Sequence, residues 1–383
     1  MDSPSLRRIA IGAWIATALA VAIVVTVGKP GKLYPTFAAA GEHFRNGEPL
    51  YPDITEHSQI LYRYSPAATA ALVPLSFMPI AVGGMLWRCV QAFAMFFALR
   101  AWARVASPAV PWPYLALLAL PLSIGNIHNG QLNLLVAALM LGGVVAFSRD
   151  RYWLAALAIV GAAVFKIYPL SLGLLLGVIE PRRFAPKLLL FTVIAFAIPF
   201  AMQSPDYVAE QYEHWFQLIE NDDRTHEPWH RGYHDFRKVL LRWELPITAD
   251  AYRGIQVAVG CAAAGVVLIG RWRKWDRPRL IQTSTSLGFL WCTLFGPATE
   301  SATYVLLAPL AAYAVAVARD RAIWERAWVI FVYAILLASN MIHWFPYSVS
   351  HVFRGTLIPQ PHAALLLLAW SILQIGRGPR ASI

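Results

Sequence analysis

The stretch at residues 7–27, RRIAIGAWIATALAVAIVVTV, decides the class of fold. It is an uninterrupted apolar run behind two arginines, and a helix needs roughly 20 apolar residues to cross the hydrocarbon core of a bilayer. A secretory signal peptide has a shorter apolar region of about 7 to 15 residues and a nearby cleavage site. We therefore interpret this stretch as an uncleaved first span with the N-terminus inside.

The composition agrees with a membrane protein. Of 383 residues, 58% are apolar and only 14% are charged, and the mean hydropathy is +0.52. These values exclude an ordinary soluble globule, and the 15 Trp, 15 Tyr and 19 Phe exclude a disordered or fibrous chain. The three cysteines lie in apolar runs without metal-binding spacing, so we expect neither a zinc site nor a disulfide framework. The predicted class is an all-α polytopic membrane protein.

Further apolar runs follow, divided at charge clusters and prolines, at 66–79, 83–103, 112–124, 132–147, 153–165, 168–179, 188–202, 252–270, 280–295, 301–318, 327–341 and 362–375. Several are short, which is tolerated where a helix is buried among others or lines a polar cavity. We expect the run 112–124 to be re-entrant or interfacial, because counting it as a span breaks the charge alternation that follows. This predicts one membrane domain over 1–383 with about twelve spans and both termini inside.

The expected topology explains where the net charge of +11 lies in the chain. Short basic connections at 149–151, 182–187, 271–279 and 319–326 alternate with long polar ones. By the positive-inside rule the basic connections face the cytoplasm, which indicates the cytoplasmic (inner) membrane. The cations there and at the two termini account for the whole excess, so membrane lipids are expected partners and nucleic acid is not.

Ionisable and aromatic side chains gather on the other, outer side, in the loop 28–65 and in the long loop 203–250, a possible lid. All ten histidines fall in or beside outer connections. His226, His230 and His234 have helical spacing, but Pro228 and Gly232 interrupt such a helix, so we expect no metal site. Polar groups at the mouth of an apolar bundle are candidates for a functional site, and we place the function there.

The first outer loop offers several candidates. Residues 33–44 have apolar positions at helical spacing, which predicts a short helix on the membrane surface. Glu42, Asp53 and Glu56 are acids in this loop. Arg63, in YRYSP before the next apolar run, either anchors the chain at the interface or faces a buried phosphate.

Three further polar sets begin or end apolar runs. The segment NIHNGQLN at 126–133 either packs helices through its glycine and amides or binds substrate. Lys166, in FKIYP, lies in the middle of a long apolar stretch, so it must snorkel, pair with an acid or meet an anionic ligand. Glu300, in GPATESATYVLLAP, is a lone carboxylate between two apolar runs, and burying it without a purpose is expensive.

The order and placement of these motifs resemble glycosyltransferase family 87. These are membrane-embedded transferases that depend on polyprenol-phosphate sugars, and they include mycobacterial phosphatidylinositol mannoside mannosyltransferases. The matching residues are Gly47, Leu50, Tyr51, Tyr62, Tyr64, Pro66, Gly130, Gln131, Asn133, Lys166, Tyr168, Pro169 and the proline-bounded stretch 297–309.

The resemblance implies a C-type, multi-spanning glycosyltransferase bundle whose active site faces away from the cytoplasm. Such an enzyme moves a sugar, here a mannose-like hexose, from a polyprenyl-phosphate donor to a hydroxyl of a lipid or glycan acceptor, without a metal or other cofactor. The family's catalytic Asp just before the loop tyrosine is missing here, because KPGKLY contains no acid before Tyr34. The family's Ser-Trp and His-His are also replaced, by Thr299 to Thr303, so neither the base nor the histidines transfer.

The site is therefore assigned by chemistry, since a carboxylate must deprotonate the acceptor and cations must stabilise the departing phosphate. The candidate bases are Glu300, Asp53, Glu56 and Glu42. The candidates for the donor phosphate and lipid are Arg63, Lys166, Tyr168, Arg237 and Arg354. The candidates for substrate contact are Tyr62, Tyr64, His128, Gln131, Asn133 and His343. The alternatives are a transporter or flippase of lipid-linked glycan and an inactive relative that only binds it.

Overall fold

The computed structural model describes residues 3–27, 33–51, 62–106, 110–224, 232–341 and 347–377, and within these ranges every regular element is a helix. The first half contains α1 (Pro4–Val27), α2 (Leu33–Asn46), α3 (Pro66–Leu72), η1 (Val73–Phe77), α4 (Ile80–Ala106), α5 (Trp112–Asn129), α6 (Asn133–Ser148), α7 (Tyr152–Phe165) and α8 (Leu170–Ile179). The second half contains α9 (Ala185–Met202), α10 (Pro205–Asn221), α11 (Phe236–Arg242), α12 (Ala249–Trp272), α13 (Arg277–Leu294), η2 (Ser301–Leu307), α14 (Ala308–Ala318), α15 (Ile323–Met341), α16 (Tyr347–Ser350), the π-helical turn η4 (His351–Thr356) and α17 (Pro359–Arg377).

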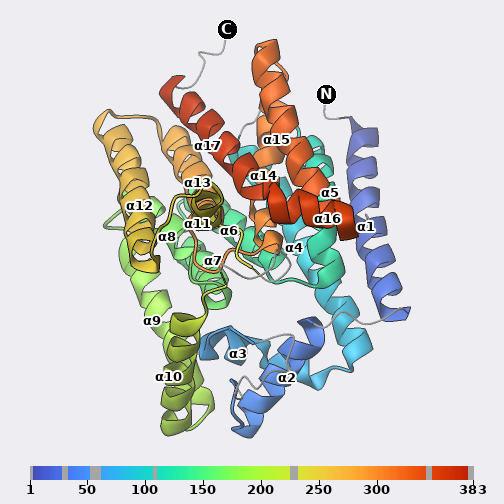
Figure 1. The fold of residues 1–383 in the computed structure, drawn as a ribbon, viewed down its shortest axis with the longest axis vertical. Helices are drawn as coiled ribbons and strands as arrows, with labels where there is room; N and C mark the ends of the chain where they lie inside the picture. Colours follow the sequence, from blue (N-terminus) through green and yellow to red (C-terminus); the bar gives the residue numbers. More distant parts are fainter. Residues whose placement is uncertain are drawn as a thin grey trace.

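The long helices form one bundle, with α2, α3 and α10 gathered at one end (Figure 1). The start of α1 and the end of α17 both lie at the opposite end, on different sides of the bundle (Figure 1). Six helices of the described chain are long and apolar enough to cross a membrane: Pro4–Val25 of α1, Ile80–Ala106, Ala185–Met202, Ala249–Trp272, the combined η2 and α14 at Ser301–Ala318, and Ile323–Met341. The prediction of an all-helical, multi-pass membrane protein is confirmed.

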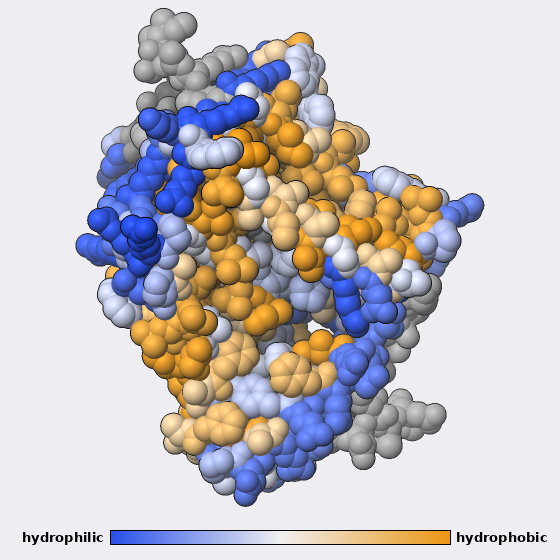
Figure 2. Space-filling view, turned by 90° about the vertical axis from the view of Figure 1, so that its left-hand side faces the viewer, coloured by the Kyte–Doolittle hydropathy of each residue, from blue (hydrophilic) through white to orange (hydrophobic). Residues whose placement is uncertain are grey.

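The outward surface of the bundle is apolar where lipid is expected. On the face that carries α9 and α12, broad apolar areas lie beside a strongly hydrophilic end, and the surface is hollowed at mid-height (Figure 2). Leu189 and Val193 of α9 are 66% and 60% exposed, and Val257 of α12 is 65% exposed. In water such a surface would be an aggregation site, whereas hydrocarbon solvates it without cost.

The basic connections meet at the end of the bundle that holds both α1's start and α17's end. Arg277 Nη1 lies 2.7 Å from Asp150 Oδ1, which joins the α12–α13 connection to the α6–α7 connection. Arg377 Nη1 lies 2.7 Å from Glu325 Oε1 and joins α17 to α15. The expected gathering of the short basic connections on one side is thus present in the fold, and their cytoplasmic location stays a prediction.

Two apolar runs bear on the expected number of spans. The run 66–79 was expected to be a span, but it forms only α3 and η1, packed against α2 and α10 at the end away from the basic connections. The run 112–124, which was expected to be re-entrant or interfacial, belongs to the continuous 18-residue helix α5, about 27 Å long, which packs on α1, α4 and α14. Pro121 lies inside α5, and Asn340 Nδ2 of α15 donates to its carbonyl at 2.9 Å. The re-entrant or interfacial position of 112–124 and the number of about twelve spans stay predictions.

The helix expected in the first outer loop is present as α2, which buries Tyr34, Phe37 and Phe44. The Tyr34 hydroxyl donates to the Leu75 carbonyl of η1 at 3.1 Å. A Cβ at Gly83 would overlap the Tyr34 side chain, so α2 approaches the start of α4 as closely as it does only because residue 83 is glycine. This contact attaches the outer layer to the bundle and positions the loop that follows α2.

The orientation of the bundle gives a first prediction. In a chain whose three cysteines are replaced by alanine, Glu48→Cys should react with a membrane-impermeant maleimide in intact cells, because residue 48 lies in the outer layer. Trp272→Cys, at an 87% exposed position at the basic end, should react only after the membrane is permeabilised. Labelling of Trp272→Cys in intact cells would reverse the proposed orientation.

Candidate active site

Lys166 lies where the apolar hairpin of α7 and α8 turns back. The helix α7 ends at Phe165, and Lys166 is its C-cap, with the extended backbone angles φ −145° and ψ 120°. The ammonium group is 5.6 Å from the ring centroid of Tyr64, a cation–π arrangement. Both ends of the hairpin connect to basic segments, so Lys166 lies at its outer tip.

The first outer loop is tied to this tip. Ser65 caps α3 by accepting from Ala68 N at 3.2 Å, and its hydroxyl also donates to the Val164 carbonyl of α7 at 3.3 Å. Trp215 Nε1 of α10 donates to the Arg63 carbonyl at 3.1 Å. These contacts fix the backbone around Arg63 between α7 and α10, so its guanidinium reaches the segment after α10.

A chain of ion pairs runs from Arg63 to Glu300. Arg63 Nε lies 2.7 Å from Asp222 Oδ2, and Asp222 Oδ1 lies 3.2 Å from Arg224 Nε. Arg224 Nη2 then lies 2.9 Å from Glu300 Oε1. The Tyr233 hydroxyl donates to Asp222 Oδ2 at 2.8 Å, and its ring lies 4.6 Å from the Arg224 guanidinium carbon. We call Arg63, Lys166, Asp222, Arg224 and Glu300 the charged cluster.

The charged cluster carries more positive than negative charge. It holds the cations Arg63, Lys166 and Arg224 against the carboxylates Asp222 and Glu300. In the part of the chain that the structure describes, Lys166 has no carboxylate within ion-pairing distance, although it lies close enough to Glu300 for their charges to interact. A buried cation without an ion pair is costly, and an anionic ligand removes that cost.

Glu300 remains reachable although it lies deep in the fold. It is the N-cap of η2, where Glu300 N donates to Thr303 Oγ1 at 3.2 Å. Its side chain is 31% exposed, compared with 12% for Asp222. Burial raises the pKa of the Glu300 carboxyl, but Lys166 and Arg224 lower it by more, so this pKa lies below its ordinary value. Glu300 is therefore an ionised carboxylate with room for a partner beside it.

The aromatic and amide candidates surround the cluster to different degrees. Tyr62 and Tyr64 lie with ring centroids 5.4 Å apart, and Tyr62 shares a 2.8 Å hydrogen bond with Thr69. The Tyr168 hydroxyl donates to Asn133 Oδ1 at 3.4 Å, and both residues are buried. Tyr62 and Tyr64 belong to the first outer loop, Tyr168 to the turn of the hairpin and Asn133 to the start of α6, and their contact with a substrate stays a prediction.

Other candidates lie apart from the charged cluster. Glu42 is exposed on α2, 4.0 Å from Arg45. His128 is exposed and bonds Asn129 at 3.2 Å, while Gln131 is half-buried just after the left-handed Gly130 that ends α5. None of the three forms an ion pair or hydrogen bond with the cluster in the described structure.

Arg237 lies at the border of the cluster, because its Nη1 is 3.1 Å from Asp223 Oδ2, next to Asp222 in the chain. The acids Asp53 and Glu56 lie outside the described residues, as does His343. Arg354 belongs to η4, but its side chain lies outside the described part. The roles expected for these residues stay predictions.

Three residues of the site were not predicted from the sequence. Asp222, Arg224 and Tyr233 come from the long outer loop, whose sequence ENDDRTHEPWHRGYHD offers many charged and aromatic residues of equal weight. No periodicity distinguishes Asp222 from Asp223, and only the fold places the former between two guanidinium groups. The sequence feature that could have indicated them is the Asp-Asp-Arg run, because the loop that contains it was expected on the same side as Lys166 and Glu300.

Asp235 is a second buried acid that sequence reasoning missed. It is the N-cap of α11, where its Oδ1 accepts from Lys238 N at 3.1 Å, and it is only 5% exposed. Burial raises the pKa of this carboxyl to about 6, although the Lys238 amide and Arg237 act in the opposite direction. The neighbouring His234 N donates to the Thr299 carbonyl at 2.7 Å, so Asp235 belongs to the segment that packs behind Glu300.

The position of Asp222 between two cations gives a second prediction. Asp222→Ala should lower the free energy of unfolding by about 3 kcal/mol, because it leaves neighbouring buried guanidinium groups without their shared carboxylate. Added inorganic phosphate should restore part of the loss. The matched control is Asp223→Ala, which removes a 49% exposed carboxylate and should cost about 1 kcal/mol or less. Thermal unfolding in detergent measures the loss of stability in both variants. Equal losses would show that Asp222 contributes no more to stability than the exposed Asp223.

The raised pKa of Asp235 gives a third prediction. Its pKa rises from 3.8 to about 6 on folding, so the folded chain keeps a proton that the unfolded chain has lost, and stability falls as pH rises through this window. Asp235→Asn keeps an N-cap and removes the cost, so it should stabilise the protein by up to about 3 kcal/mol above pH 6 and progressively less toward pH 4. Asp276→Asn, at the exposed N-cap of α13, is the control and should show no such pH dependence. A pH-independent difference for Asp235→Asn would contradict the raised pKa.

Two comparisons with known proteins bear on the family of this chain. The family model described as glycosyltransferase family 87 matches residues 62–297, which runs from the first outer loop through the end of α13. A polyprenol-phosphate-mannose-dependent alpha-(1-2)-phosphatidylinositol pentamannoside mannosyltransferase of Mycobacterium tuberculosis is 26% identical over 238 residues, or 60% of this chain. The match covers 52% of that relative, so the chain corresponds to about half its length. The family match spans more than half of the chain, and this protein belongs to glycosyltransferase family 87.

Proposed function

We propose that this protein is a membrane-embedded glycosyltransferase that moves a mannose-like hexose from a polyprenyl-phosphate carrier to a hydroxyl of a lipid or glycan acceptor. The observation that carries the proposal is the charged cluster, in which three cations meet a reachable carboxylate at the end of the bundle away from the basic connections. Family membership and the mannosyltransferase relative support the same reaction class.

The reaction defines what each group does. The acceptor hydroxyl oxygen attacks C1 of the sugar, the bond from C1 to the phosphate oxygen breaks, and the acceptor proton goes to the Glu300 carboxylate. The carrier begins as a phosphodiester with one negative charge and leaves as a phosphomonoester that has gained a second. Cations that surround this phosphate stabilise the transition state more than the ground state, because the additional charge develops as the bond breaks.

Lys166 is the first contact for that phosphate. Its ammonium lies over Tyr64 without an ion-paired carboxylate among the described residues, whereas Arg63 and Arg224 are held by Asp222. The arginines are thus preorganised and add charge without moving, while Lys166 approaches as a point charge on a flexible stem. Tyr168 borders the same hairpin, and the hollowed apolar face of the bundle offers a route for a polyprenyl chain (Figure 2).

The lowered pKa of Glu300 bears on its role. A carboxylate held ionised by cations accepts a proton poorly, so the transfer is favoured when a bound phosphate offsets the charge of those cations. A donor phosphate between Arg224 and Lys166 places negative charge beside Glu300 and raises the affinity of this carboxylate for a proton. Donor binding therefore activates the base, which couples the two substrates. The acceptor reaches this site from the non-cytoplasmic face, in line with the basic end of the bundle facing the cytoplasm.

The test of this assignment is Glu300→Gln. In membranes supplied with a polyprenyl-phosphate-mannose donor and total lipid acceptors, this variant should lower kcat by about 10²- to 10⁴-fold, the usual contribution of a general base. The matched control is Glu325→Gln. Glu325 is also a buried carboxylate 2.7 Å from an arginine, Arg377, but it lies at the basic end and should leave turnover unchanged.

Retained turnover in Glu300→Gln would remove this residue from the mechanism and leave the acids of the first outer loop as candidates. Wild-type protein that binds polyprenyl phosphate without turnover would identify an inactive relative. Movement of the intact lipid-linked sugar across a vesicle membrane without transfer would identify a transporter.

A further inference from the structure

The α12–α13 connection is a tight basic turn, RWRKWDRPR at 271–279, at the end of the bundle opposite α2 and α10. Lys274 has a left-handed backbone with φ +55°, and the Trp275 amide donates to the Gly270 carbonyl at 2.9 Å, which ends α12 in a Schellman motif. A Cβ at Gly270 would overlap the Trp275 ring, and the Arg279 guanidinium lies 3.8 Å from the centroid of the same ring. This packing leaves three cations of the turn exposed: Arg271, Arg273 and Lys274.

A second basic connection lies directly beside this turn. Arg271 Nη1 donates to the Val178 carbonyl of α8 at 3.1 Å, so the end of α12 is held against the end of α8. The C-cap of α8, Glu180, follows two residues later, and Arg182 and Arg183 after it are exposed. A contact between residues 93 apart in the sequence thus brings the cations of two connections to one corner of the bundle. We call Arg182, Arg183, Arg271, Arg273 and Lys274 the basic corner.

The basic corner has more cations than the acids around it can neutralise. Within the described ranges, none of its cations lies within ion-pair distance of a carboxylate. The acids of the same two connections are Glu180 and Asp276, and Asp276 Oδ1 already accepts from Arg279 N at 2.8 Å. Asp150 of the neighbouring connection attracts Arg183, but it is paired with Arg277 at 2.7 Å. An excess of exposed positive charge at one place attracts anions.

The surface next to the basic corner is apolar on both neighbouring helices. Leu268 and Ile269, near the end of α12, are 54% and 47% exposed, and Leu189 and Leu190, near the start of α9, are 66% and 45% exposed. On the face drawn in Figure 2, such apolar surface adjoins the hydrophilic end of the bundle. Trp272 is 87% exposed, and tryptophan prefers the boundary between headgroups and hydrocarbon. The cations therefore lie at the level of the headgroups, next to side chains that face acyl chains.

We propose that the basic corner binds the phosphate of an anionic phospholipid of the surrounding membrane, whose acyl chains lie along the exposed side chains of α9 and α12. Clustered cations next to a membrane-spanning helix are a recurrent site for such headgroups. A free anion would use the cations alone, whereas the adjoining apolar surface and Trp272 favour a lipid.

The bound lipid has a structural role and is not a substrate, because the charged cluster lies at the other end of the bundle. The helix α9 buries only Leu188 and Pro199 among its own residues, so the described chain holds it loosely. The helix α8 contacts both α9 and α12, and a lipid at its end connects these two helices. The inference is independent of the proposed function, since neither the base nor the donor phosphate enters it.

The test uses the full chain in detergent and measures bound lipid by native mass spectrometry. Dioleoyl phosphatidylglycerol and dioleoyl phosphatidylcholine share their acyl chains, and only the first has a net negative headgroup. Wild-type protein should bind the first phosphatidylglycerol about tenfold more tightly than phosphatidylcholine. The double variant Arg182→Gln/Arg273→Gln removes one exposed cation from each connection. It should weaken phosphatidylglycerol about tenfold or more, because each cation near an anionic headgroup contributes roughly a factor of five, and leave phosphatidylcholine within about twofold.

The matched control is Arg104→Gln/Arg326→Gln, which removes two exposed cations from α4 and α15 at the same end of the bundle. It changes the net charge equally and should leave phosphatidylglycerol binding within about twofold, because these cations lie outside the basic corner. Equal binding of the two lipids by the wild type overturns the site without use of any variant. Equal weakening by both double variants also overturns it, since only total charge then matters. Displacement of phosphatidylglycerol by an equal concentration of inorganic phosphate would overturn the assignment to a lipid.

Discussion

The Asp222 carboxylate lies between the guanidinium groups of Arg63 and Arg224, and the outer end of the protein depends on this arrangement. Two arginines close together in a partly buried site repel each other and lose hydration, and a shared carboxylate offsets both costs. Because Arg63 belongs to the first outer loop and Arg224 follows α10, the same interaction joins two segments that are far apart in sequence. It also leaves the cluster with one surplus cation, Lys166, whose burial cost an anionic ligand would offset.

The two ends of the bundle use charge in different ways. At the basic end, cations such as Arg277 and Arg377 pair with acids, and the positive-inside rule predicts that this end faces the cytoplasm. At the other end the charges are nearly balanced and partly withdrawn from water. Electrostatic interactions are stronger there, because fewer water dipoles screen them. A phosphate whose charge increases during the reaction gains most from cations in such surroundings.

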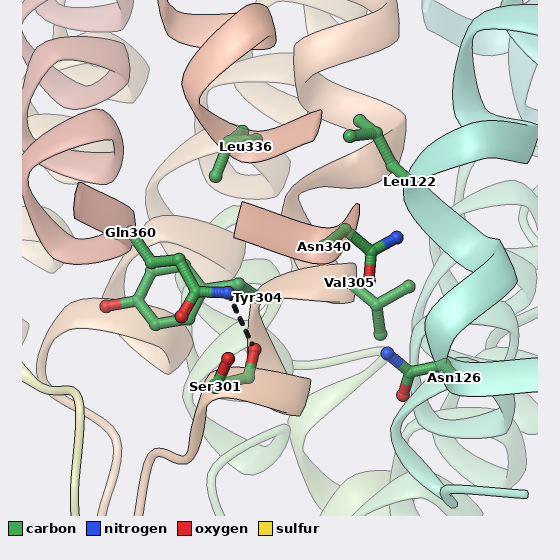
Figure 3. A pocket seen from close by; sticks show the side chains of 8 residues that line it. All are labelled: Leu122, Asn126, Ser301, Tyr304, Val305, Leu336, Asn340 and Gln360. Carbon is green, nitrogen blue, oxygen red and sulfur yellow. Dashed lines mark hydrogen bonds between the residues drawn. The ribbon is translucent and has the colours of Figure 1, made fainter. Parts of the chain in front are cut away.

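The sequence identified Arg63 by its place directly before an apolar run. It identified Lys166 and Glu300 by a single argument, which is that a charge inside an apolar stretch must have a compensating partner. That argument fails for Asp222 and Arg224, because a charged residue in a polar loop needs no explanation. The need for a carboxylate base also selected Glu42, which the fold leaves exposed on α2, since an amphipathic helix places an acid toward solvent as readily as toward a site. The sequence could not predict the small pocket between α5, α15, α17 and η2 (Figure 3), for a different reason. Its residues come from four helices, and NIHNGQLN alone does not show that only Asn126 of this motif lines it.

The sequence by itself determined the class of fold, the division into apolar runs and basic connections, and the family. These depend on local composition and short motifs, and the hydrocarbon core imposes the same helical solution wherever an apolar run is long enough. Only the tertiary structure decided that 66–79 is a short outer element and 112–129 a continuous helix of the bundle, because packing partners distinguish two runs of similar hydropathy. It also decided which acid of the long loop pairs with which arginine, and that Asn126 and Gln360 lie in one pocket beside η2. These outcomes depend on distances between residues far apart in the chain, which neither composition nor periodicity contains.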